Sequence, residues 1–131
     1  MKRLILCTGK VYVDLAATGR LAGGERATPA LAVARVEELY PFPADDIARA
    51  VAAYANLREV VWLQEEPRDM GAWTYVAPRL RDLLGGRLPL LYLGRTRRAS
   101  SAEGVHEWHL KEQASIIEAA FRDIGACPGS R

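Results

Sequence analysis

Cysteine and histidine are scarce in this sequence, which narrows the kinds of site it can carry. The 131 residues include two cysteines, Cys7 and Cys127, and two histidines, His106 and His109. A disulfide framework needs more cysteines, and a structural zinc site needs four ligands at close spacing. The two histidines share a helix face but leave a metal site incomplete. We therefore expect no metal site, and two unpaired thiols predict a reducing compartment, the cytoplasm.

Long apolar runs and an excess of charge of one sign are also lacking. The longest uncharged apolar stretch is only a few residues, too short to span a membrane. A net charge of +2 is too small to indicate a nucleic-acid partner. The chain is instead 50% hydrophobic, which excludes wholesale disorder and allows one buried core. We expect a single α/β domain over residues 1–124 and a flexible tail over 125–131.

Short apolar runs alternate with stretches of helical periodicity. Strands are predicted at residues 3–7, 31–36, 59–63 and 88–93, and helices at 10–21, about 44–54, 71–84 and 105–121. The repeat of strand and helix predicts a three-layer α/β/α domain with a mainly parallel sheet of about four strands, in the order 2-1-3-4. Apolar residues spaced 4-3-4-3 predict the buried face of the last helix: Leu110, Ala114, Ile117, Phe121 and Ile124.

The predicted strand order reverses between the first and third strands, and this reversal indicates where a ligand binds. In open parallel sheets, ligands lie beyond the carboxyl ends of the strands at such a point. The turn at residues 8–10 and a polar loop at 64–70 follow those two strands. The polar loop at 94–104 follows the fourth strand at the same edge. Polar residues of these three segments are the candidates for a site.

Three arginines close to a serine form the best candidate for an anion site. Arg95, Arg97 and Arg98 precede Ser100 in the loop after the fourth strand. Guanidinium groups bind carboxylates and phosphates through paired hydrogen bonds, although a solvated loop is an equally good interpretation. Lys10 follows the first strand, where backbone N–H groups point outward. The single glycine beside Lys10 does not make a nucleotide loop, so a simple turn is the favoured alternative there.

No residue is a convincing catalyst. Glu65 and Glu66 are adjacent, so they point in different directions and do not converge on one reacting centre. We expect them to accept hydrogen bonds from backbone donors or to meet arginines. Ser100 lies in no nucleophile-elbow motif, and Cys7 is expected to be inert in its buried strand.

The aromatic residues near the reversal have two interpretations. Trp62, Trp73 and Tyr75 form either an apolar protein interface or part of the ordinary core. The sequence pattern favours neither.

Five motifs, in order, resemble the C-terminal domain of the 2-oxoglutarate dehydrogenase E1 component, a relative of the transketolase C-terminal domain. Together they extend over nearly the whole chain. The combination of Tyr-Pro-Phe-Pro with Gln-Glu-Glu-Pro is typical of the E1 family. The motifs are LCTGKVYVDL at residues 6–15, VEELYPFP at 36–43, VVWLQEEPRDMGAW at 60–73, LYLGR at 91–95 and HLKEQ at 109–113.

The resemblance implies a part in the oxidative decarboxylation of 2-oxoglutarate in the tricarboxylic acid cycle. In that family, E1 uses thiamine diphosphate and Mg²⁺ and passes a succinyl group to lipoyl-E2. The cofactor-binding motifs lie in other E1 domains, so this chain alone is expected to hold no cofactor and to be inactive. Its partners would be the remaining E1 domains, the E1 dimer partner and lipoyl-E2.

The resemblance also implies an effector or interface role for residues at the predicted edge. Lys10, Gln64 and Arg95 match family motifs there, with Glu65 and Glu66 positioning the loop. AMP and acetyl-CoA are the effectors implied by the family. The loop at residues 96–104 keeps the family length but loses both prolines and gains positive charge, which indicates a divergent member.

Two alternatives stay open beside the E1 domain. One is a free-standing module that binds a nucleotide or CoA. The other is the equivalent domain of a transketolase or of another 2-oxo acid dehydrogenase.

Overall fold

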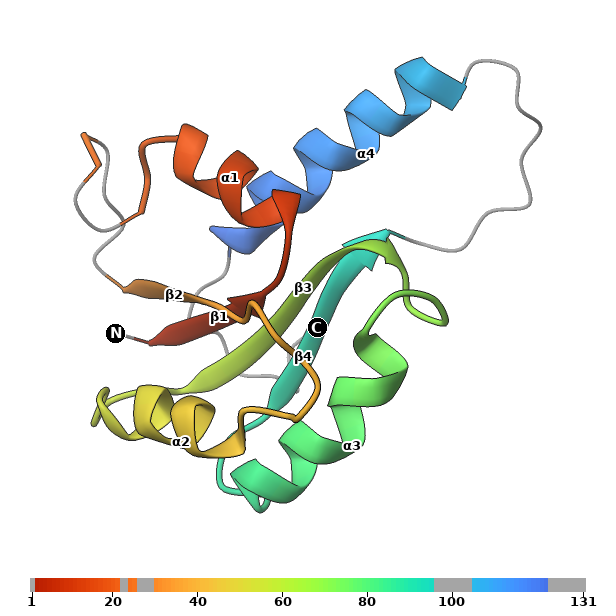
Figure 1. Ribbon diagram of the computed structural model, residues 1–131. Helices are drawn as coiled ribbons and strands as arrows, with labels where there is room; N and C mark the ends of the chain where they lie inside the picture. Colours follow the sequence, from red (N-terminus) through yellow and green to blue (C-terminus); the bar gives the residue numbers. More distant parts are fainter. Residues whose placement is uncertain (1, 22–23, 26–29, 96–104, 123–131) are drawn as a thin grey trace.

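The computed structural model describes residues 2–21, 24–25, 30–95 and 105–122, and Figure 1 shows a parallel sheet between two layers of helices. The strand order is β2-β1-β3-β4, as predicted, and all three strand pairs are parallel. The predicted tail at residues 125–131 lies outside the described residues. The elements are β1 (Arg3–Cys7), α1 (Lys10–Ala17), β2 (Leu31–Arg35), α2 (Ala44–Ala52), β3 (Glu59–Pro67), α3 (Trp73–Leu84), β4 (Leu90–Arg95) and α4 (Val105–Ala120).

Each face of the sheet carries its own core because side chains alternate along the strands. Leu4 and Leu6 of β1 point to the face covered by α2 and α3. Ile5 and Cys7 point to the face covered by α1 and α4. All four side chains are fully buried. This two-sided burial explains why the inner strands are apolar runs without alternating polar positions.

The third strand is longer than predicted. Residues 64–67 belong to β3, whereas the polar sequence predicted a loop from residue 64. The strand continues because β4 also continues, and Pro67 is the register partner of Arg95 after an irregularity that begins beyond Leu63. A non-local partner therefore overrides the local polar pattern.

The first helix is shorter than predicted. It ends at Ala17, four residues before the predicted end. The Thr18 hydroxyl donates to the Leu15 carbonyl oxygen at 2.6 Å, and Gly19 has a φ of 73°. A positive φ is a conformation that glycine adopts readily and that ends a helix.

The buried face of the last helix agrees with the predicted one only in part. Phe121 is buried as predicted, and Ile116 and Ala120 are buried beside it. Ala114 is exposed and Ile117 is half-buried, which the prediction missed. The side chains of Leu110 and Ile124 lie outside the described part of the chain. Spacing alone predicts that one face is apolar, but neighbouring positions differ by about 100° around the helix. The docking of α4 against α1 and the sheet selects the face.

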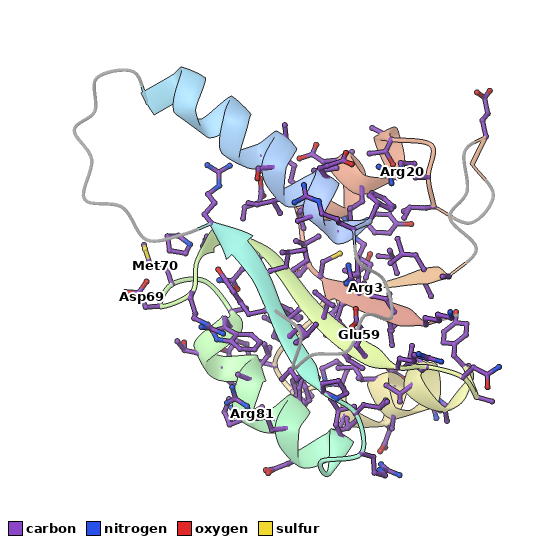
Figure 2. The ribbon with its side chains drawn as sticks, turned by 180° about the vertical axis from the view of Figure 1, so that it is seen from behind. Arg3, Arg20, Glu59, Asp69, Met70 and Arg81 are labelled. Atoms are coloured by element: carbon purple, nitrogen blue, oxygen red, sulfur yellow. The ribbon has the colours of Figure 1, made fainter. Side chains whose placement is uncertain are left out.

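A buried ion pair joins the start of the sheet to the end of α4. Arg3 and Glu59 are register partners on β1 and β3, and they are 3% and 1% exposed. Arg3 Nε donates to Glu59 Oε2, and Arg3 Nη1 donates to the carbonyl oxygens of Ala119 at 3.3 Å and Ala120 at 2.9 Å. Figure 2 shows the two side chains together at the starts of their strands. The guanidinium group thus supplies donors to the last turn of α4, where carbonyl oxygens have no intrahelical partner.

Replacing Glu59 by glutamine is expected to destabilise the fold strongly. The change keeps the side-chain shape but removes the negative charge beside buried Arg3. Breaking a buried pair from one side costs about 3–5 kcal/mol. Urea unfolding monitored by tryptophan fluorescence measures the loss. The control is Arg49→Ala, which breaks the exposed Asp46–Arg49 pair and is expected to cost less than about 1 kcal/mol. Equal losses in the two variants would contradict the prediction.

Candidate functional site

The carboxyl ends of β1, β3 and β4 bring charged side chains together at one edge of the sheet. Gly9 joins β1 to α1 with a φ of 77°, so the turn needs a glycine. Lys10 follows, and its exposed ammonium group lies 3.0 and 3.2 Å from the two carboxylate oxygens of Asp14. That hydrogen bond and the Asp14 charge raise the pKa of Lys10, and the nearby Glu65 carboxylate adds to the effect.

A chain of hydrogen bonds connects this lysine to β4 through α4. Asp14 Oδ2 accepts from Gln113 Nε2 at 2.7 Å, and Gln113 Oε1 accepts from Arg95 Nη2 at 2.8 Å. Arg95 is only 9% exposed, so the end of β4 holds a nearly buried positive charge. We call Lys10, Asp14, Gln113 and Arg95 the edge network. Its members come from α1, β4 and α4, and Gln113 lies 99 positions from Asp14 in the sequence.

Sequence reasoning found two of these four residues. Lys10 and Arg95 were candidates, and the structure brings them to the same edge as Glu65. Asp14 and Gln113 were not candidates for the site, although both lie inside motifs of the resemblance. Asp14 is four residues after Lys10, a spacing that places both on one helix face, and this is the signal that was available.

The side chain of Gln64, near the end of β3, holds the connection between β3 and α3. This side chain is 3% exposed. Gln64 Oε1 accepts from Trp62 Nε1 at 2.9 Å and from the Trp73 backbone N–H at 3.0 Å. Gln64 Nε2 donates to the carbonyl oxygens of Glu66, Pro67 and Met70 at 3.2, 2.9 and 2.9 Å. One amide therefore fixes both ends of this connection.

The two glutamates after Gln64 do not converge, as predicted. Glu65 is half-buried on the side of the edge network, whereas Glu66 is exposed. The backbone carbonyl of Glu66 accepts from the Tyr92 hydroxyl at 2.8 Å, so Glu66 contributes through its main chain. The arrangement gives no pair of carboxylates that act on one reacting centre.

Gly94 lets β4 approach the end of β3 closely. A Cβ atom at this position would lie 2.3 Å from Tyr92 Oη and 2.9 Å from the Gln64 carbonyl oxygen. The tyrosine is partly buried, and this burial raises its pKa. Only glycine therefore fits before Arg95 without moving the Tyr92 hydroxyl from the Glu66 carbonyl.

The comparisons with known proteins agree with the five motifs. The family described as 2-oxoglutarate dehydrogenase C-terminal matches residues 1–121. The chain belongs to this family. It is 49% identical over 126 residues to the 2-oxoglutarate dehydrogenase E1 component of an Exiguobacterium species, a match that covers 95% of this chain. The E1 components of a Geobacillus species and of Bacillus pumilus are 46% and 45% identical over 122 and 117 residues, covering 92% and 89% of this chain.

The chain spans only about one eighth of the length of these relatives. The matched sections are 13%, 12% and 12% of the three E1 components. Within the 2-oxoglutarate dehydrogenase C-terminal family, this chain therefore shows what the matched section looks like. Arg95 of the Gly-Arg motif and the glutamine of HLKEQ belong to the edge network, and Glu65 of the Gln-Glu-Glu-Pro motif lies near its Lys10.

The structure decides only part of the remaining predictions. Trp62 and Trp73 are 1% and 6% exposed, so these two belong to the core rather than to a free interface.

Arg97, Arg98 and Ser100 lie outside the described residues, and their anion-binding role stays a prediction. The two histidine side chains are also outside the described part. Among the side chains that the structure describes, no three histidine, cysteine, aspartate or glutamate residues lie together as metal ligands.

No described helix is long and apolar enough to cross a membrane.

The thiol of Cys7 is inert, as the sequence predicts. It is fully buried in β1, and burial raises its pKa to about 12 from 9.0. The thiolate is the reactive form, so the folded protein keeps this cysteine unreactive near neutral pH.

Gln64→Ala is expected to lower the free energy of unfolding by about 2–4 kcal/mol, because it leaves buried donors and acceptors without partners. Denaturant titration measures the loss. Glu66→Gln changes an exposed side chain at the end of β3 and is expected to stay within about 0.5 kcal/mol of the parent. A Gln64→Ala variant as stable as the Glu66→Gln control would show that the connection does not depend on the amide.

Cys7 predicts a fall in stability at alkaline pH. Its folded pKa lies above its unfolded value, so its contribution is complete below pH 9 and is lost as the pH rises towards 12. The loss is about 1.4 kcal/mol per pH unit in that window. We expect the unfolding free energy of Cys7→Ser, measured in the same pH series, to fall less steeply than that of the parent. Parallel slopes would contradict the assignment.

Proposed function

We propose that this chain acts as the non-catalytic C-terminal domain of a 2-oxoglutarate dehydrogenase E1. The observation that carries the proposal is the family match over residues 1–121, together with 49% identity to an E1 component over 95% of the chain. In this role the domain packs against the other E1 domains and supports the E1 dimer. The whole enzyme decarboxylates 2-oxoglutarate and transfers a succinyl group to lipoyl-E2, in the cytoplasm.

The geometry supports a binding role over a catalytic one. At the edge of the sheet, the charged groups bond to one another: Lys10 to Asp14, and Asp14 through Gln113 to Arg95. A general acid or base needs a group poised to exchange a proton with a substrate. The lysine here has a raised pKa and stays protonated at neutral pH, which suits a cation that holds an anion.

Our proposal assigns thiamine diphosphate and Mg²⁺ to the other E1 domains. Mg²⁺ at a diphosphate takes one or two protein carboxylates beside the phosphate oxygens. Among the described residues, no three histidine, cysteine, aspartate or glutamate side chains lie together. We derive no chemical step through the cofactor here.

A second proposal concerns the edge of the sheet. Lys10 and Arg95 supply two cations there. Further donors for a phosphate-bearing effector would come from Arg97, Arg98 and Ser100, whose anion-binding role is a prediction from the sequence. Glu65 lies beside them. AMP and acetyl-CoA are the effectors to test, with Gln64 and Glu66 holding the connection in place. This proposal is favoured by the nearly buried position of Arg95, which is fixed by Gln113.

A domain exchange tests the E1 role. The matched 126-residue section of the Exiguobacterium E1 component is replaced by this chain, and 2-oxoglutarate-dependent reduction of ferricyanide is measured with thiamine diphosphate and Mg²⁺. We expect activity within about tenfold of the parent E1 and none for the chain alone. The control carries Glu59→Gln in the exchanged section and is expected to inactivate at a lower temperature. The Exiguobacterium E1 that carries this chain is called the chimaeric E1. A chimaeric E1 that folds but is inactive would contradict the proposal, and so would turnover by the chain alone.

Thermal unfolding of the chain tests the effector site. A ligand at about 100 times its Kd stabilises the folded state by about 2.7 kcal/mol. We expect AMP or acetyl-CoA to raise Tm in proportion to the logarithm of its concentration. Lys10→Ala, which removes an exposed cation, is expected to weaken this shift severalfold. The control is Arg58→Ala, because Arg58 begins the approach to β3 at the opposite edge. An equal shift in parent and Lys10→Ala would exclude the lysine from the site.

A further inference from the structure

The Tyr-Pro-Phe-Pro segment, residues 40–43, lies outside the edge network and has no part in it. It belongs to the connection from β2 to α2, which runs beside the face covered by α2 and α3 (Figure 1). Hollows lie on both of its sides. One, of about 580 Å³, is bounded by this connection, α2 and the ends of β1 and β2. The other, of about 420 Å³, lies between α2 and α3. Phe42 lines both hollows.

The segment forms an exposed but well-held aromatic ridge. Tyr40 is 71% exposed, yet its ring centroid is 4.4 Å from that of Tyr75 on α3. Phe42 meets the same ring edge-on at 6.3 Å. The Tyr75 hydroxyl donates to the Leu39 carbonyl oxygen at 3.1 Å and fixes the connection to α3. Rigid, exposed aromatic side chains are typical anchors of protein interfaces because little conformational entropy is lost when they bind.

The surroundings of the ridge are acidic, although the chain as a whole carries a net charge of +2. The two arginines that line the hollows are both engaged. Arg35 lies over the Tyr12 ring and near Glu37, and Arg79 lies over the Tyr75 ring. The five carboxylates that line the hollows are Glu37, Glu38, Asp45, Asp46 and Asp82.

Three of these carboxylates form no ion pair within the part of the chain that the structure describes. Asp46 pairs with Arg49, and Glu37 pairs with Arg35 at 3.9 Å. Glu38, Asp45 and Asp82 form no ion pair with any described residue. Local negative charge on both sides of an apolar ridge is complementary to a segment that carries lysine or arginine next to apolar residues.

We propose that this ridge binds an extended basic segment of the rest of the E1 chain. The inference rests on the function proposed above and adds the surface and the chemistry of the contact. Nearly nine-tenths of each E1 relative lies outside the section matched by this chain. Covalent attachment gives such a segment a high effective concentration at the ridge, so weak charge pairs and one aromatic anchor are enough to hold it. An extended backbone lets its side chains enter the hollows on both sides.

Amide hydrogen exchange in the active chimaeric E1 tests the contact. The backbone N–H groups of Glu37, Glu38, Leu39, Tyr40 and Phe42 donate to no acceptor among the described residues. Without a covering segment they exchange quickly, so any protection reports the partner. We expect these N–H groups to exchange at least about tenfold more slowly in the unmutated chimaeric E1 than in its Glu38→Lys, Asp45→Lys variant. Glu25→Lys reverses an exposed charge on the connection from α1 to β2 and is the matched control, expected to leave the protection unchanged.

The outcomes separate this inference from the function on which it rests. Fast hydrogen exchange of these N–H groups in an active chimaeric E1 overturns the docking surface and leaves the E1 role intact. Protection that survives the double charge reversal overturns the basic nature of the segment. An inactive chimaeric E1 contradicts the E1 role and this inference together.

Discussion

The buried pair of Arg3 and Glu59 is the interaction on which the remaining structure depends. Two charges in an apolar interior are tolerated only when they are paired and their other hydrogen-bonding groups are satisfied. Arg3 meets this condition only if β1 and β3 start in register and the last turn of α4 ends above them. The pair therefore selects the position of α4. That position in turn brings Gln113 between Arg95 and Asp14.

At the opposite edge, one amide has a comparable role. Gln64 occupies a buried strand position and satisfies donors and acceptors on both sides of the connection to α3. Gly94 then lets the next strand lie against this connection. The edge is thus held by hydrogen bonds within the chain, and a surface fixed in this way loses less entropy when it binds a partner. Lys10 and Arg95 are held in a rigid frame, and the aromatic ridge with its surrounding carboxylates lies on the other helical layer.

The sequence predicted the architecture well because its signals are local. Apolar runs flanked by helical periodicity gave the strands, and right-handed crossovers limited their order. The prediction failed where a distant partner decided the outcome. Residues 64–67 are polar, but they extend β3 because β4 reaches Arg95. The prediction for α4 failed in part for the same reason: Phe121 is buried as predicted, but the docking of the helix also buries Ile116 and leaves Ala114 exposed.

For the candidate site, the sequence by itself determined the edge, the family motifs and two of the cations. Those follow from residue type and from strand order, which nearby residues encode. Only the tertiary structure decided which groups meet. Gln113 bonds to Asp14 across 99 positions of sequence, and Gln64 turns inward to hold the backbone. Such hydrogen bonds depend on the angle and depth at which a helix packs on the sheet, and no local pattern encodes that geometry.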